Sequence, residues 1–316
     1  MQKENGMNYN HKDITFPSSD GKNTIHAELF IPSDNNIRCV VQISHGMMDY
    51  IGRYKLLAEA LCSAGIALAG NDHLGHGDSV STPDDYGFFA SKNGYDYVID
   101  DVKRMNDLIR SEIPDVPVIL LGHSMGSFIA RLYAIKYADS IDGLIIHGTA
   151  GPNPATGAGL LLVKLMRAIK GERYRSRFIC SLADGGYNKG FDPSEGDGAW
   201  LTRDPSMVAD RVGNPKNEFI FTLAGYQDLF CFLGDCNASA WFKSFPKSLS
   251  TLVISGEQDP VGGFGKGVKY VFDNLKKNSA DVQLKLYPGA RHELFNETNR
   301  EEVFSDLINW IEGVIK

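Results

Sequence analysis

The sequence is poor in cysteine, with five among 316 residues, an odd number without close pairs. A secreted disulfide framework usually has an even set of cysteines in a short chain, and a zinc site needs closely spaced ligands. A chain of this length buries roughly three quarters of its unfolded surface, so it needs neither device to fold. We therefore expect buried thiols in a reducing compartment.

Long apolar runs are also missing. The longest, residues 157–163, is far shorter than the roughly 18 residues needed to span a bilayer. Residues 1–20 are polar and contain neither the apolar core nor the cleavage site of a secretory signal peptide. These features predict a soluble protein of the cytoplasm.

Positive charge is outnumbered by negative charge. The chain has 32 Lys and Arg against 39 Asp and Glu, a net charge of −7. Sequence-independent binding of nucleic acid depends on a cationic surface, so nucleic acid is not an expected partner. Apolar residues make up 43% and charged residues 22% of the chain, which excludes a disordered or fibrous protein.

Short apolar strands alternate with amphipathic helices in the first half of the chain. We expect strands at residues 24–31, 39–44, 66–70, 116–121 and 144–147, and helices at 54–63, 95–113 and 128–138. The pattern returns near the C-terminus, with strands at 249–255 and 282–287 and helices at 267–277 and 301–315. Such alternation predicts an α/β fold with a parallel sheet covered on both faces.

Residues 151–246 interrupt this pattern. They contain no clear strand and are rich in Gly, Asn, Pro and helix-like stretches. At about 150 residues per domain, the chain has room for one large domain or two. The simplest interpretation is one α/β core formed by residues 1–150 and 247–316, with a helical insertion at 151–246.

Residues 122–126, Gly-His-Ser-Met-Gly, have the pattern G-x-S-x-G. An expected strand leads directly into them and an expected helix follows. This is the context of a nucleophile elbow, in which the two glycines permit a strained turn that holds the serine hydroxyl at the carboxyl edge of the sheet. We predict that Ser124 is a nucleophile rather than part of an ordinary glycine-rich turn.

A serine hydroxyl needs a base, and the base needs a third group that fixes its tautomer. In this architecture the chain order is Ser, then Asp or Glu, then His. His292 follows the last expected strand, whereas its competitor His147 falls inside a strand and is interpreted as a core histidine. Asp259 follows the first strand after the insertion, in a Gly-x-x-Asp-Pro turn that favours it over its neighbour Glu257.

An oxyanion hole requires two backbone N–H groups beside the nucleophile. One is expected from Met125, the residue after Ser124, and the other from the loop that follows an early strand. Met47 occupies that position, and Gly46 before it lets the backbone approach a substrate closely. We expect the elbow to direct His123 elsewhere. None of these groups requires a metal or an organic cofactor.

Four segments together resemble monoacylglycerol lipases and bacterial lysophospholipases: residues 45–54 (His-Gly-Met-Met-Asp-Tyr-Ile-Gly-Arg-Tyr), 72–79 (Asp-His-Leu-Gly-His-Gly-Asp-Ser), 122–127 (Gly-His-Ser-Met-Gly-Ser) and 289–293 (Gly-Ala-Arg-His-Glu). The resemblance runs from about residue 12 to the C-terminus. It implies an α/β-hydrolase fold with a helical cap, a Ser-His-Asp triad, and hydrolysis of single-chain acyl esters such as monoacylglycerols or lysophospholipids.

The resemblance leaves two alternatives open, because the same superfamily contains esterases and prolyl-aminopeptidase-like enzymes. The protein would then be a general short-chain esterase or an amide hydrolase. An amide hydrolase needs acidic cap residues that bind the substrate amine. The available ones are Glu172, Glu195 and Glu218, and their spacing in the sequence does not indicate such a site. The family usually has Glu-His where this chain has Asp49 and Tyr50, a difference that bears on headgroup recognition.

Two further patterns allow a structural and a functional interpretation. One is a group of residues of the kinds that bind metal ions: Asp72, His73, His76 and Asp78. The resemblance and a tight glycine turn among them favour a structural loop instead. The other is an apolar helix face in the insertion: Ala158, Leu161, Leu162, Leu165, Met166 and Ile169. Six cations accompany it against the single Glu172: Lys164, Arg167, Lys170, Arg173, Arg175 and Arg177.

That apolar face either packs on its own domain or lines an acyl channel. In the second case the basic edge beside it would contact anionic lipid, so a transient contact with a membrane surface is an expected interaction. The phenylalanine-rich stretch 219–232 would line the same channel or form the core of the cap.

Overall fold

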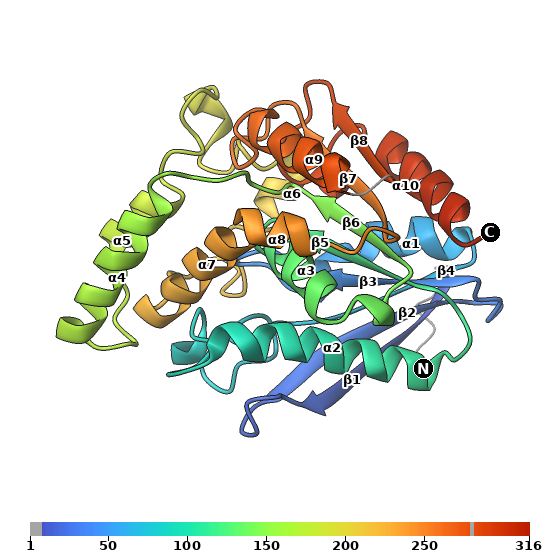
Figure 1. Cartoon of the computed structure of the whole chain (residues 1–316), viewed down its shortest axis with the longest axis horizontal. Helices are drawn as coiled ribbons and strands as arrows, with labels where there is room; N and C mark the ends of the chain where they lie inside the picture. Colours follow the sequence, from blue (N-terminus) through green and yellow to red (C-terminus); the bar gives the residue numbers. More distant parts are fainter. Residues whose placement is uncertain (1–7, 279–280) are drawn as a thin grey trace.

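The computed structural model describes residues 8–278 and 281–316, and an eight-stranded sheet forms its centre (Figure 1). The strand order is β1-β2-β4-β3-β5-β6-β7-β8. The strands are β1 (Tyr9–Pro17), β2 (Thr24–Pro32), β3 (Cys39–Ser44), β4 (Ile66–Asn71), β5 (Val118–His123), β6 (Gly143–His147), β7 (Ser250–Gly256) and β8 (Val282–Tyr287). Strands β3 to β8 run parallel, and β2 pairs antiparallel with both β1 and β4.

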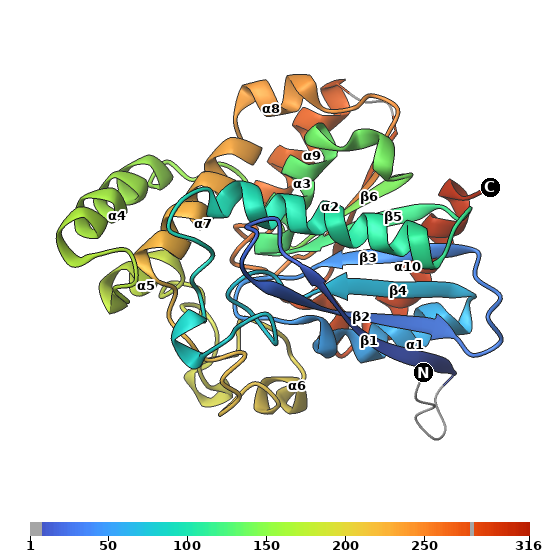
Figure 2. The ribbon, with the colours of Figure 1, turned by 90° about the horizontal axis from the view of Figure 1, so that it is seen from below.

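Helices cover both faces of the sheet, as Figure 2 shows from below. One face packs against α1 (Lys55–Ser63) and α10 (Arg300–Val314), and the other packs against α2 (Gly94–Glu112), α3 (Met125–Lys136) and α9 (Lys266–Asn278). Every residue of β3, β4, β5 and β6 is buried. This two-sided burial explains why these strands are continuous apolar runs in the sequence.

The expected strands and helices of the core are present, with small shifts at their ends. β5 extends to the residue before Ser124, and α3 begins at the residue after it. The sequence analysis missed β1, an edge strand that pairs only with β2 and keeps several positions partly exposed. A half-exposed edge strand has a mixed polar sequence, so its apolar signal is weak.

The chain between β6 and β7, residues 148–249, contributes no strand to the described part of the sheet, and we call it the cap segment. It contains α4 (Thr156–Lys170), α5 (Arg177–Ala183), α6 (Pro205–Ala209), α7 (Leu223–Cys236) and α8 (Ser239–Ser244). One short 3₁₀ turn, η4 (Pro193–Glu195), also lies in this segment. The other four lie in the core: η1 (Ile51–Tyr54), η2 (Pro83–Asp85), η3 (Ala138–Ser140) and η5 (Leu294–Asn296). In both views α4 and α5 lie at the left edge of the molecule, away from the sheet (Figures 1 and 2). Within the described ranges, no helix is both long and apolar enough to cross a membrane.

A buried arginine on α3 connects both ends of the cap segment to the core. Arg131 is fully buried, and its guanidinium lies 4.6 Å above the ring of Trp241. It donates to the carbonyl oxygens of Ala150 and Cys236 and to Oδ1 of Asn237. Cys236 is the last residue of α7, where the helix dipole favours a cation. The helix that follows Ser124 therefore holds the entry and the exit of the cap segment.

Candidate active site

Ser124 occupies a strained turn between β5 and α3, with φ of 54° and ψ of −122°. Such a conformation costs about 1–3 kcal/mol for a residue other than glycine and is typical of active sites. A Cβ on Gly126 would lie 1.8 Å from the carbonyl oxygen of Ser44, and one on Gly122 would lie 2.3 Å from the carbonyl oxygen of Gly126. Both glycines of the motif are therefore required by close backbone contacts.

Ser124 lines a cavity between the core and the cap segment. The volume that the centre of a water-sized sphere can occupy in it is about 90 Å³. Much of the wall is apolar or aromatic: Phe128, Ala150, Ala183, Tyr187, Trp200, Leu201, Leu229, Phe230, Leu233 and Val261. Three charged residues also line it: Asp49, Arg211 and Glu293. The cavity combines the hydroxyl-bearing Ser124 with a largely apolar wall.

His292 and Asp259 form a buried pair beside this cavity. Nδ1 of His292 lies 3.0 Å from Oδ2 of Asp259, and the two side chains are 2% and 0% exposed. Asp259 also accepts hydrogen bonds from the Ser255 hydroxyl at 3.1 Å and the Val261 N–H at 2.9 Å. Burial opposes the charged carboxylate, but the His292 ring and these donors hold the pKa of Asp259 below its usual range. An ionised Asp259 favours the imidazole tautomer with its proton on Nδ1, which leaves Nε2 as a hydrogen-bond acceptor.

The imidazole of His292 is held between aromatic neighbours. Its ring centroid lies 5.1 Å from that of Trp200 and 4.8 Å from that of His123, and a Cβ on Gly148 would lie 3.1 Å from its Cε1. His123 also lines the cavity, so the expectation that the elbow directs it elsewhere is wrong. Ser124 and His292 line the same cavity, and the described hydrogen bonds do not join them.

The two rival residues have other surroundings. Glu257 is exposed, whereas Asp259 is fully buried. His147 is buried, with its Nδ1 3.1 Å from Nδ1 of His123 and its Nε2 accepting the N–H of Leu294. Burial and the nearby His292 lower the pKa of His147 to about 3, so it stays neutral. The prediction of a core histidine at this position is confirmed.

Two backbone N–H groups are available near Ser124. The N–H of Met125 is the first of α3 and has no acceptor within the helix. The N–H of Met47 makes no hydrogen bond to another described residue, and both methionines line the cavity. A Cβ on Gly46 would lie 3.0 Å from Cβ of Ser124, so the loop approaches Ser124 closely.

The sequence analysis missed a buried ion-pair network at the charged part of the cavity. Arg53 donates to Asp49 at 2.9 Å and to Glu293 at 2.8 Å, and Arg211 of the cap segment donates to Glu293 at 2.8 Å. Tyr54 donates to the other oxygen of Asp49 at 2.8 Å. Despite burial, the charges of Arg53 and Arg211 hold the pKa of Glu293 well below its usual range. Two cations and two carboxylates thus balance, and both oxygens of Asp49 are engaged within the chain.

Comparison with known proteins places this geometry in a family. The family described as serine aminopeptidase, S33, matches residues 35–299. The chain belongs to this family. It is 27% identical to a monoacylglycerol lipase of Mycolicibacterium smegmatis over 281 residues, which covers 88% of this chain and 89% of the relative. It is 28% identical over 270 residues to the phospholipase YtpA of Bacillus subtilis, with 84% and 92% covered.

A solved structure agrees with these relatives. A thermostable carboxyl esterase from Bacillus coagulans in complex with glycerol superimposes with a TM-score of 0.90 at 29% identity, covering 97% of this chain and 99% of the esterase. The predicted α/β-hydrolase fold and the resemblance to monoacylglycerol lipases and bacterial lysophospholipases are confirmed. The protein is a serine hydrolase.

The apolar face of α4 in this S33 hydrolase does not line the cavity, so its interpretation as the wall of an acyl channel is wrong. Leu161, Leu165 and Ile169 are 61%, 56% and 79% exposed, and none of them lines the cavity. The buried residues of α4 are Gly159 and Val163, on the side that packs against α7. Leu162 and Met166 of the same face are partly buried and pack against the core, as the packing interpretation expects, whereas the three exposed side chains point away from it. Of the stretch 219–232, Leu229 and Phe230 line the cavity, whereas Phe221 and Phe232 are buried in the core.

The loop at residues 72–79 of the hydrolase is organised by one carboxylate. Asp72 accepts the N–H groups of Ile51 and Asp78, each at 2.8 Å, and lies 2.9 Å from Nδ1 of His26. His26, Asp72 and Asp78 each place a ligand atom within 4.8 Å of the other two, so this set has the chemistry to hold a cation. His73 and His76, which the sequence analysis grouped with Asp72 and Asp78, do not belong to this set. The contacts of Asp72 agree with a structural loop.

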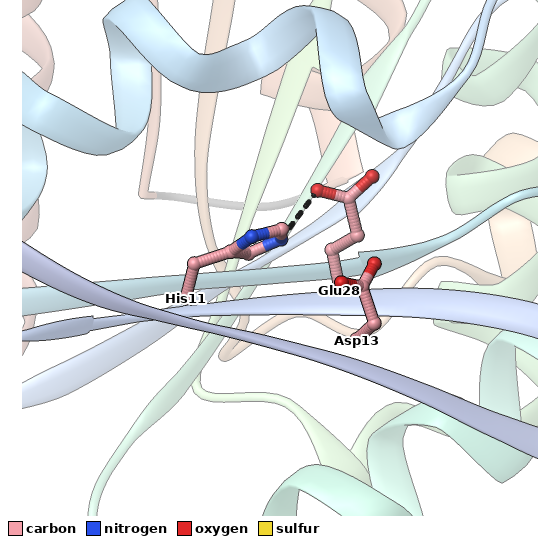
Figure 3. A group of neighbouring side chains, drawn as sticks. All are labelled: His11, Asp13 and Glu28. Atoms are coloured by element: carbon pink, nitrogen blue, oxygen red, sulfur yellow. Dashed lines mark hydrogen bonds and ion pairs between the residues drawn. The ribbon is translucent and has the colours of Figure 1, made fainter. Parts of the chain in front are cut away.

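A second such set lies on the first hairpin, away from the cavity. His11 and Asp13 on β1 and Glu28 on β2 also place one ligand atom each within 4.8 Å of one another (Figure 3). Nε2 of His11 lies 2.8 Å from Oε2 of Glu28, and Asp13 lies 3.2 Å from Nε2 of His26. These pairs connect the edge strand to β2.

Proposed function

We propose that this serine hydrolase cleaves carboxylic esters of single acyl chains through an acyl-enzyme on Ser124. In this mechanism Ser124 attacks the ester carbonyl, and Nε2 of His292 takes its proton and returns it to the leaving alcohol. Asp259 orients the imidazole and stabilises the imidazolium. The N–H groups of Met47 and Met125 bind the oxyanion, and water then deacylates Ser124. The strained Ser124 in a largely apolar cavity beside the buried, hydrogen-bonded Asp259–His292 pair is the observation that carries this proposal.

The charge balance of the cavity favours a neutral headgroup. Among the described residues that line the cavity, Arg211 is the only Lys or Arg, and Glu293 already pairs with it. A phosphate headgroup would need an uncompensated donor to replace its hydration. We therefore propose a monoacylglycerol rather than a lysophospholipid as the preferred substrate, and the apolar wall as the site of the acyl chain.

The surroundings of the acidic cap residues do not favour an amide hydrolase that binds a substrate amine. Glu172 accepts hydrogen bonds from Ser91 and Arg167, and Glu195 pairs with Arg291. Glu218 is exposed and does not line the cavity that contains Ser124. A substrate amine bound near Ser124 would therefore find none of these cap carboxylates, and the two carboxylates that do line the cavity, Asp49 and Glu293, already pair with arginines.

Hydrolysis rates on three matched substrate pairs test this proposal. We expect turnover of p-nitrophenyl acyl esters but not of aminoacyl anilides, a preference for octanoyl over acetyl esters, and faster hydrolysis of monooleoylglycerol than of lysophosphatidylcholine. Faster cleavage of the anilides would support the aminopeptidase alternative. An optimum at acetyl would support a short-chain esterase. A protein that fluorophosphonate does not label would contradict the role of Ser124.

We also propose that residues 151–246 act as the cap and that its outer face contacts anionic lipid. Large apolar side chains are exposed on and beside α4 and α5: Leu161, Leu165, Ile169, Tyr174, Phe178 and Leu182. Of the six cations of residues 164–177, three bind groups within the chain (Arg167, Arg173 and Arg175), and three accompany this face: Lys164, Lys170 and Arg177. Apolar side chains that enter the interface and cations that attract anionic headgroups act together.

Vesicle assays test the lipid contact. Replacing Lys164 and Lys170 by Gln should weaken turnover of long-chain substrate in phosphatidylglycerol vesicles at low salt, since salt screens this attraction. Hydrolysis of soluble short-chain esters should stay unchanged. Equal turnover of the variant and the wild type in those vesicles at low salt would contradict the contact. The cytoplasmic location stays a prediction from the sequence.

A further inference from the structure

The loop that carries the Met47 N–H contains a strained residue. Met48 has a φ of 52°, in the left-handed region that residues other than glycine rarely adopt. Strained residues persist at functional sites only where the surrounding structure determines their conformation. We call residues 46–50 the oxyanion loop, since the proposed oxyanion donor Met47 lies within it. Something outside the loop must therefore hold Met48.

That support comes from residues 211–217 of the cap segment, which we call the loop clamp. The side-chain amide of Asn217 donates to the carbonyl oxygen of Met48 at 2.8 Å, and Nη2 of Arg211 donates to the same oxygen at 3.2 Å. Asn214 donates to the Tyr50 hydroxyl at 3.3 Å, and the ammonium group of Lys216 lies 5.0 Å from the centre of that ring. Tyr50, which replaces the usual histidine of the family, is thus a contact with the cap.

Two donors on one carbonyl fix the plane of the peptide that follows Met48. Asn217 is only 4% exposed, so water does not readily replace its hydrogen bond. Arg211 extends the same support to the base, because its other terminal nitrogen donates to Glu293, the residue after His292. Arg211 therefore couples the oxyanion loop to the loop that carries the proposed base.

We propose that Asn217 and Arg211 are positioning residues that hold the oxyanion loop of this enzyme in its working conformation. The inference rests on the proposed function, in which the Met47 N–H stabilises the oxyanion. The cap then contributes to transition-state stabilisation as well as to the wall of the cavity. The oxyanion forms only in the reaction, so loss of the clamp lowers kcat and leaves KM unchanged.

The test compares two variants, Asn217→Ala and Arg211→Lys. The lysine keeps a positive charge opposite Glu293 but lacks the forked guanidinium that reaches both Glu293 and the carbonyl oxygen of Met48. The matched control is Asn274→Ala on α9, which removes a similar hydrogen bond from a side-chain amide to a backbone carbonyl, far from the cavity. For Asn217→Ala we expect a fall in kcat of about 10–100-fold, below the loss of an oxyanion donor itself. Arg211→Lys should lower kcat in the same direction. The control should match the wild type.

Two readouts separate positioning from general structural damage. The fall in kcat for Asn217→Ala should be the same for p-nitrophenyl acetate, butyrate and octanoate, because all three form the same oxyanion. The inhibition constant of a trifluoromethyl ketone, which forms a tetrahedral oxyanion on the serine, should rise by the same factor. Thermal unfolding of each variant checks that it is folded. If Asn217→Ala does not fold, the kcat and the inhibition constant of Arg211→Lys test the inference.

The outcomes distinguish this inference from the proposed function. An active wild type whose clamp variants change only KM, or lose more activity on longer chains, overturns the inference and makes the clamp part of the acyl wall. Clamp variants with unchanged kcat overturn it as well. A wild-type protein inert to esters and to fluorophosphonate overturns the proposed function, and this inference with it.

Discussion

Acyl-chain preference should depend on α7 and not on α4, although both helices carry leucines at helical spacing. Leu229 and Leu233 on α7 line the cavity, whereas Leu161 and Leu165 on α4 are 61% and 56% exposed. The double variant Leu229→Ala/Leu233→Ala therefore tests the acyl wall. Leu161→Ala/Leu165→Ala is its matched control, with the same residue type and the same four-residue spacing.

The size of the effect follows from the burial of methylene groups. Each buried CH₂ contributes about 0.8 kcal/mol, so the four that distinguish an octanoyl from a butyryl ester contribute about 3.2 kcal/mol. At about 1.4 kcal/mol per tenfold, this is a ratio of roughly 200 in kcat/KM. If the two α7 leucines form about half of the wall that the added methylenes contact, the ratio falls to roughly 15 in the variant.

The assay is kcat/KM for p-nitrophenyl butyrate and octanoate, both below the concentration at which the substrate forms micelles. Thermal unfolding of both double variants serves as the control for folding, since truncating buried leucines also destabilises a protein. A chain-length ratio that stays near the wild-type value in the α7 variant, or that falls in the α4 variant, would refute this account of the cavity.

Three further changes have defined expectations. Ser124→Ala should abolish ester hydrolysis and fluorophosphonate labelling without lowering the unfolding temperature, and labelling that persists would place the nucleophile elsewhere. Asp259→Asn should lower kcat by about 10⁴-fold, as expected for a wrong imidazole tautomer, whereas the exposed Glu257→Gln should leave kcat near the wild-type value; the reverse result would show that the acid is misassigned. Burial disfavours the charged ring of His26, but the hydrogen bond and charge of Asp72 raise its pKa from 6.5 to about 9. The protonated ring of His26 therefore stabilises the fold below pH 6.5, and this stabilisation is lost as the pH rises through 9. His26→Gln should lower the free energy of unfolding in urea more at pH 6 than at pH 10, and an equal loss at both would contradict this role.

Three of the contacts that connect the cap segment to the core have consequences for function. Arg131 binds its two ends, Arg211 reaches Glu293, and Asn217 reaches the carbonyl oxygen of Met48. The last two contacts lie at the proposed catalytic groups. Changes in the cap are therefore expected to affect the rate of the chemical step as well as the choice of substrate.

Local patterns located most of the core and the candidate site. The strands are visible as apolar runs because both faces of the sheet are covered, and β1 was missed because its polar residues 10–13 interrupt any such run. Periodicity found the apolar stripe of α4 but not its surroundings. A stripe shows which residues share a face, and only the tertiary structure shows that part of this face packs inward while Leu161, Leu165 and Ile169 stay exposed.

The sequence by itself determined the positions of Ser124, Asp259 and His292, because each lies at the carboxyl end of a strand and the parallel sheet brings those ends to one edge. The tertiary structure alone decided the pairing of Arg53 with Glu293, 240 positions apart, and the contact of Asn217 with Met48. No local pattern encodes such contacts. They depend on how the cap segment packs on the core, and this packing results from the whole folded chain.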